Sequence, residues 1–228
     1  MKYIGSKRFV LKHILPIMLK ERGDRVWVEP FVGGANVICN ITGERIGNDT
    51  HKYLIALLRA VQEGWIPPTE VSKELYYSVK DNPDIFKDEF VGFVGFLCSF
   101  GAKWWGGYAK NKRGENFAGE GSRSIFKQAK TLGGVKFTCM NYCDMVIPDN
   151  SLIYCDPPYA GTSVLDVDFN HFEFWEWCRN RSREGHIVFV SEYNAPDDFE
   201  CLLEMDTITN LNKNGRSPRL DKLFKFKG

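Results

Sequence analysis

The sequence lacks any apolar run long enough to cross a bilayer, which takes about 20 residues. Its longest apolar stretch, residues 90–100, is interrupted by Gly92 and Gly95 and predicts a buried helix. There is no apolar leader with a cleavage site, and the seven cysteines are an odd set without C-x-x-C pairs. These absences predict a protein that has no membrane segment and works in a reducing cytoplasm.

Two phosphate-binding patterns are missing as well. Neither G-x-G-x-x-G nor G-x-x-x-x-G-K-[ST] occurs, which argues against a dinucleotide or a nucleoside triphosphate and disfavours a nicotinamide enzyme. The four histidines are scattered, and the closest cysteines, Cys139 and Cys143, do not have metal-ligand spacing. We therefore expect no metal site.

The chain has 228 residues, 43% of them hydrophobic, which is enough for one sizeable core and a small appended lobe. Its net charge is only +1, yet residues 103–136 hold eight basic and two acidic side chains, and residues 213–228 hold six basic and one acidic. This segregation predicts two basic surfaces that face a polyanion. Aromatic residues and six glycines alternate at 101–121 and predict a mobile loop whose rings stack or wedge.

One motif closes an apolar, β-rich run and consists of Asp156, Pro157, Pro158 and Tyr159. Because proline cannot continue a ladder of backbone hydrogen bonds, Asp156 is expected at the carboxyl end of a strand. There a planar amine can donate to the Asp156 carboxylate and the Pro157 carbonyl while the Tyr159 ring stacks on a base. Taken alone, the tetrapeptide fits a solvated turn with a packed tyrosine equally well.

A second motif runs from Glu29 to Gly34 and follows a short apolar strand. Gly33 and Gly34 predict a tight turn and the start of a helix, where backbone approaches a nucleotide-like ligand. A further short strand ends in Asp49, at the place where doubly wound folds put the acceptor for ribose hydroxyls. Asp49 also fits a helix N-cap, and the two roles are compatible.

The order of elements predicts a mostly parallel α/β sheet. Strands are expected near residues 25–28, 45–47, 135–140, 151–155 and 186–190, and helices at 53–62 and 169–181. Residues 63–134 are too many for a simple connection, so we expect a small helical lobe there.

A third block, Gly5-Ser6-Lys7, lies in the basic and aromatic start of the chain. In this order, the three blocks resemble the Dam-like D12 class (alpha group) of site-specific DNA adenine-N6 methyltransferases, with its G-x-K, D/E-P-F-x-G-G and D-P-P-Y motifs. Segments at 142–144, 188–193 and 219–224 extend the resemblance over most of the chain. Residues 106–109 are similar to a phage-type subgroup.

The resemblance implies a Rossmann-like catalytic domain at residues 1–62 and 135–228, with an inserted helical target-recognition domain at 63–134. It implies S-adenosylmethionine as methyl donor, S-adenosylhomocysteine as product, no metal, and catalysis by Asp156 to Tyr159. The positions that match cofactor-binding residues are Tyr3, Lys7, Glu29, Phe31, Gly33, Gly34, Asp49, Asp144 and Met145. Glu29 replaces the commoner aspartate, and the target hairpin of well-known members is not matched, so no target sequence is carried over.

The implied partner is double-stranded DNA. Candidate contacts from the two basic regions are Lys103, Tyr108, Lys110, Lys112, Arg113, Arg123, Lys213 and Arg216. We expect a monomer in the cytoplasm of a bacterial cell, encoded by the host, a phage or a prophage. A pairing with a restriction endonuclease stays open.

The expected chemistry starts with an adenine swung out of the duplex and received beside Tyr159. Asp156 and the Pro157 carbonyl then stabilise the positive charge that grows on the amine as it takes the methyl group. Two alternatives are a methyltransferase of the same fold acting on cytosine N4 or another amine, and a DNA-binding relative without turnover.

Overall fold

The computed structural model describes residues 1–110, 114–159, 169–209 and 217–228. The chain forms two compact units: the first unit is Met1–Ser6 and Val32–Tyr142, and the second unit is Lys7–Phe31 and Cys143–Gly228. Strands and helices occur in both, so the predicted α/β class is confirmed. The division into a catalytic and a recognition domain at residues 63 and 134 stays a prediction.

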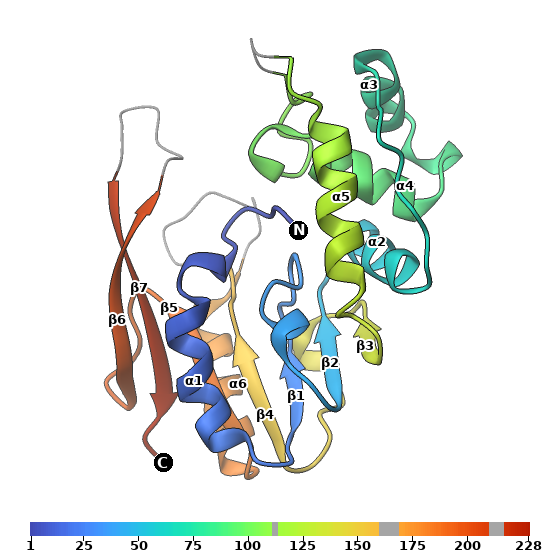
Figure 1. The fold of residues 1–228 in the computed structure, drawn as a ribbon. Coiled ribbons are helices and arrows are strands. Elements are labelled where there is room, and N and C mark those ends of the chain that lie inside the picture. Colours follow the sequence, from blue (N-terminus) through green and yellow to red (C-terminus); the bar gives the residue numbers. More distant parts are fainter. Residues whose placement is uncertain (111–113, 160–168, 210–216) are drawn as a thin grey trace. The chain divides into compact units, whose positions relative to one another are not determined.

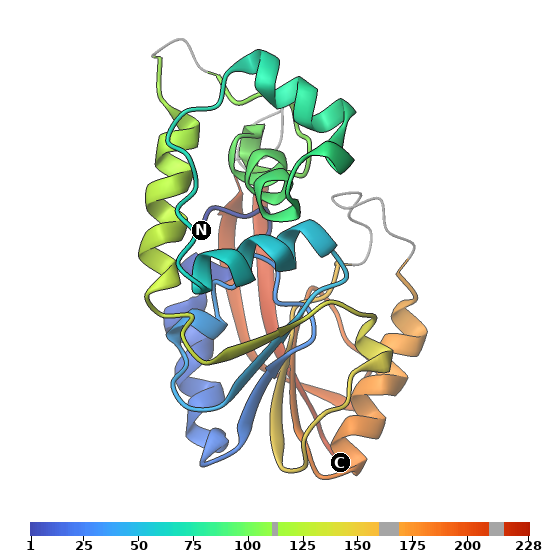
Figure 2. The ribbon, with the colours of Figure 1, turned by 90° about the vertical axis from the view of Figure 1, so that its right-hand side faces the viewer.

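The second unit is built around a mixed sheet (Figure 1). Its strands, in spatial order, are β1 (Val26–Glu29), β4 (Ser151–Cys155), β5 (Ile187–Glu192), β7 (Ser217–Phe226) and β6 (Phe199–Thr209). β1, β4 and β5 are mutually parallel, whereas β7 runs antiparallel to β5 and to β6. Helices α1 (Leu11–Arg22) and α6 (His171–Arg183) lie on opposite faces of this sheet (Figures 1 and 2).

Strand β4 lies in the middle of the parallel part. All five of its residues are buried, as expected for a strand covered on both faces. Its register pairs Ile153 with Val28 on β1 and with Val188 on β5. The carboxyl ends of the three strands therefore meet at one edge, which is where parallel α/β sheets carry ligand sites.

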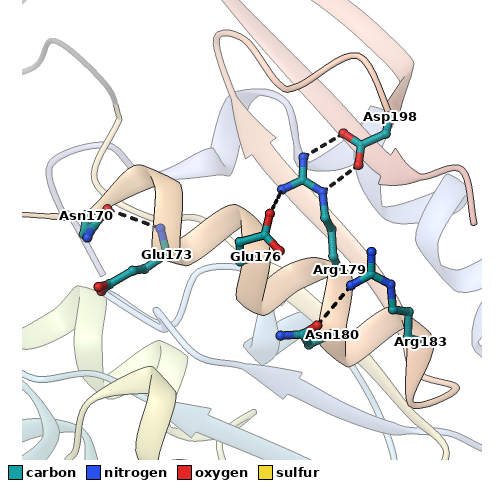
Figure 3. A network of polar contacts seen from close by, with 7 residues as sticks. All are labelled: Asn170, Glu173, Glu176, Arg179, Asn180, Arg183 and Asp198. Carbon is teal, nitrogen blue, oxygen red and sulfur yellow. Dashed lines mark hydrogen bonds and ion pairs between the residues drawn. The ribbon is translucent and has the colours of Figure 1, made fainter.

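Helix α6 covers one face of the sheet, and polar contacts of its side chains hold it in place (Figure 3). Its N-cap is Asn170, whose Oδ1 accepts from the Glu173 backbone N–H at 3.2 Å. Arg179 holds Asp198 through two parallel bonds, Nε to Oδ2 at 2.6 Å and Nη2 to Oδ1 at 2.8 Å, and it also pairs with Glu176. These contacts fasten the helix to the chain that leads into β6.

The first unit contains the parallel pair β2 (Arg45–Asn48) and β3 (Val135–Thr138). Its helices are α2 (Lys52–Gln62), α3 (Lys73–Asp81), α4 (Asp88–Gly92), the π-helix η4 (Phe93–Leu97) and α5 (Phe117–Ala129). Short 3-10 turns occur at η1 (Lys7–Phe9, in the second unit), η2 (Ile38–Asn40), η3 (Pro83–Ile85), η5 (Phe100–Ala102) and η6 (Tyr142–Asp144). No helix in the described part of the chain has the length and apolar character needed to cross a membrane.

Helix α2 is amphipathic and forms the centre of the first unit. Leu54, Leu57, Leu58 and Val61 follow i, i+3, i+4, i+7 spacing and are buried. Gly92 on α4 lets the two helices approach closely, since a Cβ there would lie 2.1 Å from the Tyr53 carbonyl oxygen.

Four sequence predictions differ from the structure. The glycine turn after β1 is followed only by η2, because left-handed Gly33 and Ala35 (φ 48° and 54°) turn the chain. Helix α2 is capped by the His51 ring, whose Nδ1 accepts from the Leu54 N–H, rather than by Asp49. The antiparallel hairpin β6–β7 was missing from the predicted strands.

The fourth difference concerns the aromatic residues expected on a mobile loop. Trp104 is half-buried and packs against His51, Tyr53 and Phe96, with ring centroids 4.3, 5.5 and 4.8 Å apart. Gly95 makes room for it, because a Cβ there would lie 2.2 Å from the indole. The Trp104 ring is therefore packed against neighbouring side chains of the first unit.

Candidate active site

Asp156 follows β4 directly, so its place at the carboxyl end of a strand agrees with the sequence prediction. Pro157 is buried, while Asp156, Pro158 and Tyr159 are half-buried. The two neighbouring parallel strands also end in acids, Glu29 on β1 and Glu192 on β5, and both are 2% exposed. The edge of the second unit's sheet is thus strongly acidic.

Lys7 supplies a positive charge to this edge. It lies in η1, its side chain is only 7% exposed, and its Nζ is 2.9 Å from Asp156 Oδ1 and 3.8 Å from Asp221 Oδ1. The ammonium also lies 4.5 Å from the centroid of the Tyr159 ring, within cation–π range. One buried lysine therefore contacts the acid and the aromatic ring of the D-P-P-Y motif.

Burial dominates the electrostatics of the two motif acids. It raises the pKa of Asp156, and the nearby Lys7 ammonium opposes that rise. Burial likewise raises the pKa of Glu29 well above its usual range, although the Trp27 indole N–H, donated to Glu29 Oε1 at 2.7 Å, lowers it in part. Perturbed acids at a strand edge are typical of functional sites.

The Tyr159 ring is held in a defined orientation. It meets Tyr193 edge-to-face, with centroids 4.6 Å apart and planes at 89°. Its hydroxyl donates to Asp221 Oδ1 across 3.5 Å, and burial raises its pKa well above the usual value, so the phenol is neutral. A neutral, fixed ring is suited to stacking on a planar base.

The glycine turn of the first unit forms a cradle around Tyr3. A Cβ on Gly33 would lie 2.9 Å from Tyr3 Cε1, and one on Gly34 would lie 2.6 Å from Tyr3 Cβ, so neither position accepts a larger residue without a shift. Asp49 closes the turn: its Oδ2 accepts from the Gly33 N–H at 3.1 Å and its Oδ1 from the His51 N–H at 3.0 Å.

The Asp49 carboxylate has the acceptor chemistry that a ribose hydroxyl would require, and the assignment of this turn to the cofactor stays a prediction. Each Asp49 oxygen has further lone pairs that can accept a ribose hydroxyl, and the side chain is only half-buried. Burial raises the Asp49 pKa, and the backbone donors of His51, Gly33 and Thr50 counteract that rise, which favours the carboxylate as an acceptor. Tyr3, Gly33, Gly34 and Asp49 lie together in the first unit.

The other predicted cofactor residues lie in the second unit. Phe31 packs edge-to-face on Phe169 and Phe174, with centroids 5.7 Å away in each case. Asp144 is exposed at the end of η6, and Met145 beside it is buried. Lys7, expected at the cofactor's carboxylate, is placed against Asp156.

The predicted DNA contacts differ in their surroundings. Lys103, Lys110 and Arg123 are exposed in the first unit. Tyr108 is half-buried, its hydroxyl donates to the Val71 carbonyl at 2.8 Å, and it packs against Tyr76, so it serves the core. Four predicted contacts lie outside the described residues: Lys112, Arg113, Lys213 and Arg216.

Part of the second basic region is neutralised within the sheet. Lys222 pairs with Glu204 on β6 at 3.1 Å, and Lys225 pairs with Glu21 on α1. These ion pairs reduce the free positive charge that residues 213–228 can present, and the basic surface expected there stays a prediction.

Sequence reasoning missed Asp221. It lies on β7 next to Lys222, whose backbone is in register with Glu192, the last residue of β5. The local sequence carried no clear strand signal, because Leu220 to Phe224 places two charged residues side by side and then two apolar ones instead of alternating them. Its basic composition suggested a surface segment instead.

Comparison with known proteins gives a family. The model of the D12 class N6 adenine-specific DNA methyltransferase matches residues 3–90. The type II methyltransferase M.MjaIII of Methanocaldococcus jannaschii is 27% identical over 251 residues, covering 90% of this chain and 87% of that protein. The DNA adenine methylase of Escherichia coli K12 is 30% identical over 187 residues, covering 72% of this chain and 66% of that protein.

Among solved structures, precorrin 8W decarboxylase of Methanobacterium thermoautotrophicum aligns with 99% of this chain and 93% of that chain. The sequence identity is 9% and the TM-score is 0.41.

Proposed function

Because the chain belongs to the D12 class of N6 adenine-specific DNA methyltransferases, we propose that its D-P-P-Y edge holds a flipped adenine of double-stranded DNA for methylation at N6. The observation that carries this proposal is the cluster of Lys7, Asp156 and Tyr159 at the end of β4. It combines a hydrogen-bond acceptor with a fixed aromatic face, which is what an exocyclic amine on a base requires.

When bound, S-adenosylmethionine supplies a sulfonium methyl group and leaves as S-adenosylhomocysteine. Asp156 accepts an N–H of the adenine amine and directs the nitrogen lone pair, while the Pro157 carbonyl accepts the other N–H. Positive charge grows on the amine as the new bond forms, and these two acceptors stabilise it. Burial raises the Asp156 pKa, which suits the carboxylate to take the surplus proton afterwards.

On the cofactor side, we propose that Tyr3, Gly33 and Gly34 shape the floor and that Asp49 accepts from the ribose hydroxyls. The close approach of Tyr3 to both glycines and the two backbone donors on Asp49 support this assignment. Glu29, Phe31, Asp144 and Met145 remain proposed cofactor residues on the strength of the resemblance.

On the DNA side, we propose that exposed Lys103, Lys110 and Arg123 meet backbone phosphates. Residues 63–134 would then form the target-recognition domain around them. The similarity of residues 106–109 to phage-type members supports a phage-type subgroup, and the enzyme would act as a monomer, alone or beside a restriction endonuclease.

The experiment uses purified protein, S-adenosylmethionine with a labelled methyl group, and a random DNA library. Mass analysis of the digested DNA is expected to show N6-methyladenine and no N4-methylcytosine, and Asp156→Ala is expected to remove the product while cofactor binding persists. Methylated cytosine, or an active Asp156→Ala variant, would contradict the proposal. Sequencing that detects modified adenine would give the recognised sequence.

A further inference from the structure

Lys7 contacts two carboxylates. The first belongs to Asp156 of the D-P-P-Y motif, and the second belongs to Asp221 on β7. Its Oδ1 lies 3.8 Å from Lys7 Nζ, and the Tyr159 hydroxyl donates to the same oxygen across 3.5 Å. The Asp221 side chain is 19% exposed, so both interactions are partly shielded from water. Asp221 Oδ1 therefore contacts both the Lys7 ammonium and the Tyr159 hydroxyl, which lie beside Asp156.

We propose that Asp221 is a positioning residue for methyl transfer, acting through Lys7. It draws the ammonium to one side, so that Lys7 neutralises Asp156 while leaving it acceptor capacity for the adenine amine. The inference rests on the proposed function, because it assumes that Asp156 receives that amine.

The need for a second acid follows from burial. A buried ammonium must be paired, and Lys7 is only 7% exposed. With Asp156 as its sole close acid, the lysine would be drawn fully onto the carboxylate that the substrate needs, and substrate binding would have to break that pair. A second acid at 3.8 Å lets Lys7 keep a partner when adenine arrives.

The strand geometry makes this arrangement specific. Residues 221, 223 and 225 share one face of β7, and Lys225 on that face pairs with Glu21 of α1. Lys7 lies in η1, just before α1, so Asp221 projects toward it. A one-residue shift of register would present Lys222 instead and place a second cation beside Lys7.

The test is a double-mutant cycle on methylation kinetics. Asp221→Asn is expected to lower kcat by about 10- to 100-fold, by analogy with the hydrogen-bond partners that orient metal ligands, with the cofactor Kd unchanged within about twofold. Asp221→Glu keeps the charge and should recover most of the rate. In the Lys7→Gln background, Asp221→Asn should cost nothing further, because its effect passes through Lys7.

The matched control is Glu204→Gln, which removes the acid of the Glu204–Lys222 pair on the same hairpin and should leave kcat unchanged. Thermal unfolding of each variant separates a folding defect from a positioning defect. A full kcat in Asp221→Asn, or losses that add fully to those of Lys7→Gln, would overturn the inference.

A second readout does not depend on turnover. In protein labelled at lysine Nζ, the Lys7 ammonium resonance should shift in Asp221→Asn and in Asp156→Asn but not in Glu204→Gln. A Lys7 signal insensitive to Asp221 would overturn the inference even in an active enzyme. If the wild-type protein methylates no adenine but the shifts occur, the proposed function fails while the coupling of Lys7 to Asp221 stands.

Discussion

Trp27 donates its indole N–H to Glu29 Oε1 over 2.7 Å, inside a strand where both side chains are almost completely buried. Glu29 is the first residue of the E-P-F-V-G-G motif. Burial raises its pKa well above the usual range, so ionisation of this carboxylate lowers the free energy of unfolding.

The pH dependence of this cost has a definite sign. Between the usual and the raised pKa, the folded state keeps a proton that the unfolded state has released, so stability falls as the pH rises through that window. Glu29→Gln keeps an oxygen for Trp27 and removes the charge. We expect the variant to be more stable than the wild type at pH 8, on the order of 1 kcal/mol, with the gap closing toward pH 4.

Urea unfolding at a series of pH values, without cofactor, measures this difference. Glu204→Gln is the control, because that carboxylate is 54% exposed and its removal should not change the pH dependence. A Glu29→Gln variant that is less stable than the wild type at every pH would show that the charge itself stabilises the fold.

A second prediction concerns the acid limb of activity. Asp156 must be ionised to accept the adenine amine, and burial raises its pKa, so kcat/KM should fall with decreasing pH before the usual aspartate value of about 4 is reached. The Lys7 ammonium lowers that pKa, and Lys7→Gln should therefore move the limb to higher pH.

Lys222→Gln is the matched lysine control, since Lys222 pairs with Glu204. Its pH profile should overlay that of the wild type. If the acid limb of kcat/KM stays at the same pH in Lys7→Gln, a group other than Asp156 is responsible for that limb.

A third prediction tests the glycine cradle. In Gly34→Ala the new methyl group would lie 2.6 Å from Tyr3 Cβ, so the Tyr3 side chain or the turn must move. Overpacking costs about 1–3 kcal/mol, and we expect this cost to weaken the bound state and raise the cofactor Kd by about 5- to 150-fold. Isothermal titration with S-adenosylhomocysteine measures it, and Gly133→Ala, which has open space around its Cβ, should bind normally. Equal affinity of the two variants would remove Gly34 from the site.

The sequence predicted the parts of the fold that have a local pattern. Apolar runs ending in Glu29 or Asp156 marked β1 and β4, because buried parallel strands read as continuous apolar stretches. The hairpin β6–β7 was not predicted, because Glu204 and Lys222 interrupt its apolar pattern with charges that form an ion pair only across the two strands.

The candidate site divides in the same way. Asp156 and Tyr159 were found because they are adjacent to a strand end and match a motif. The contacts of Lys7 with Asp156 and Asp221 join three distant parts of the chain, and no local spacing indicates them. The motif gave Lys7 a role by resemblance, and only the packing of η1 against this edge shows which carboxylates it meets.

The last prediction separates phosphate contacts from ordinary surface charges. Lys103, Lys110 and Arg123 are exposed in the first unit, so each that neutralises a phosphate releases a counterion. Changing one of them to Gln should weaken DNA binding on all sequences and reduce the slope of log K against log salt by about 0.9. Lys20→Gln, an equal loss of charge at an exposed position on α1, is the control. Fluorescence anisotropy of a labelled duplex across salt concentrations gives the slope for each variant. If the Lys20 variant shows the same change in slope as the other three, the change reflects the loss of net charge and not a phosphate contact.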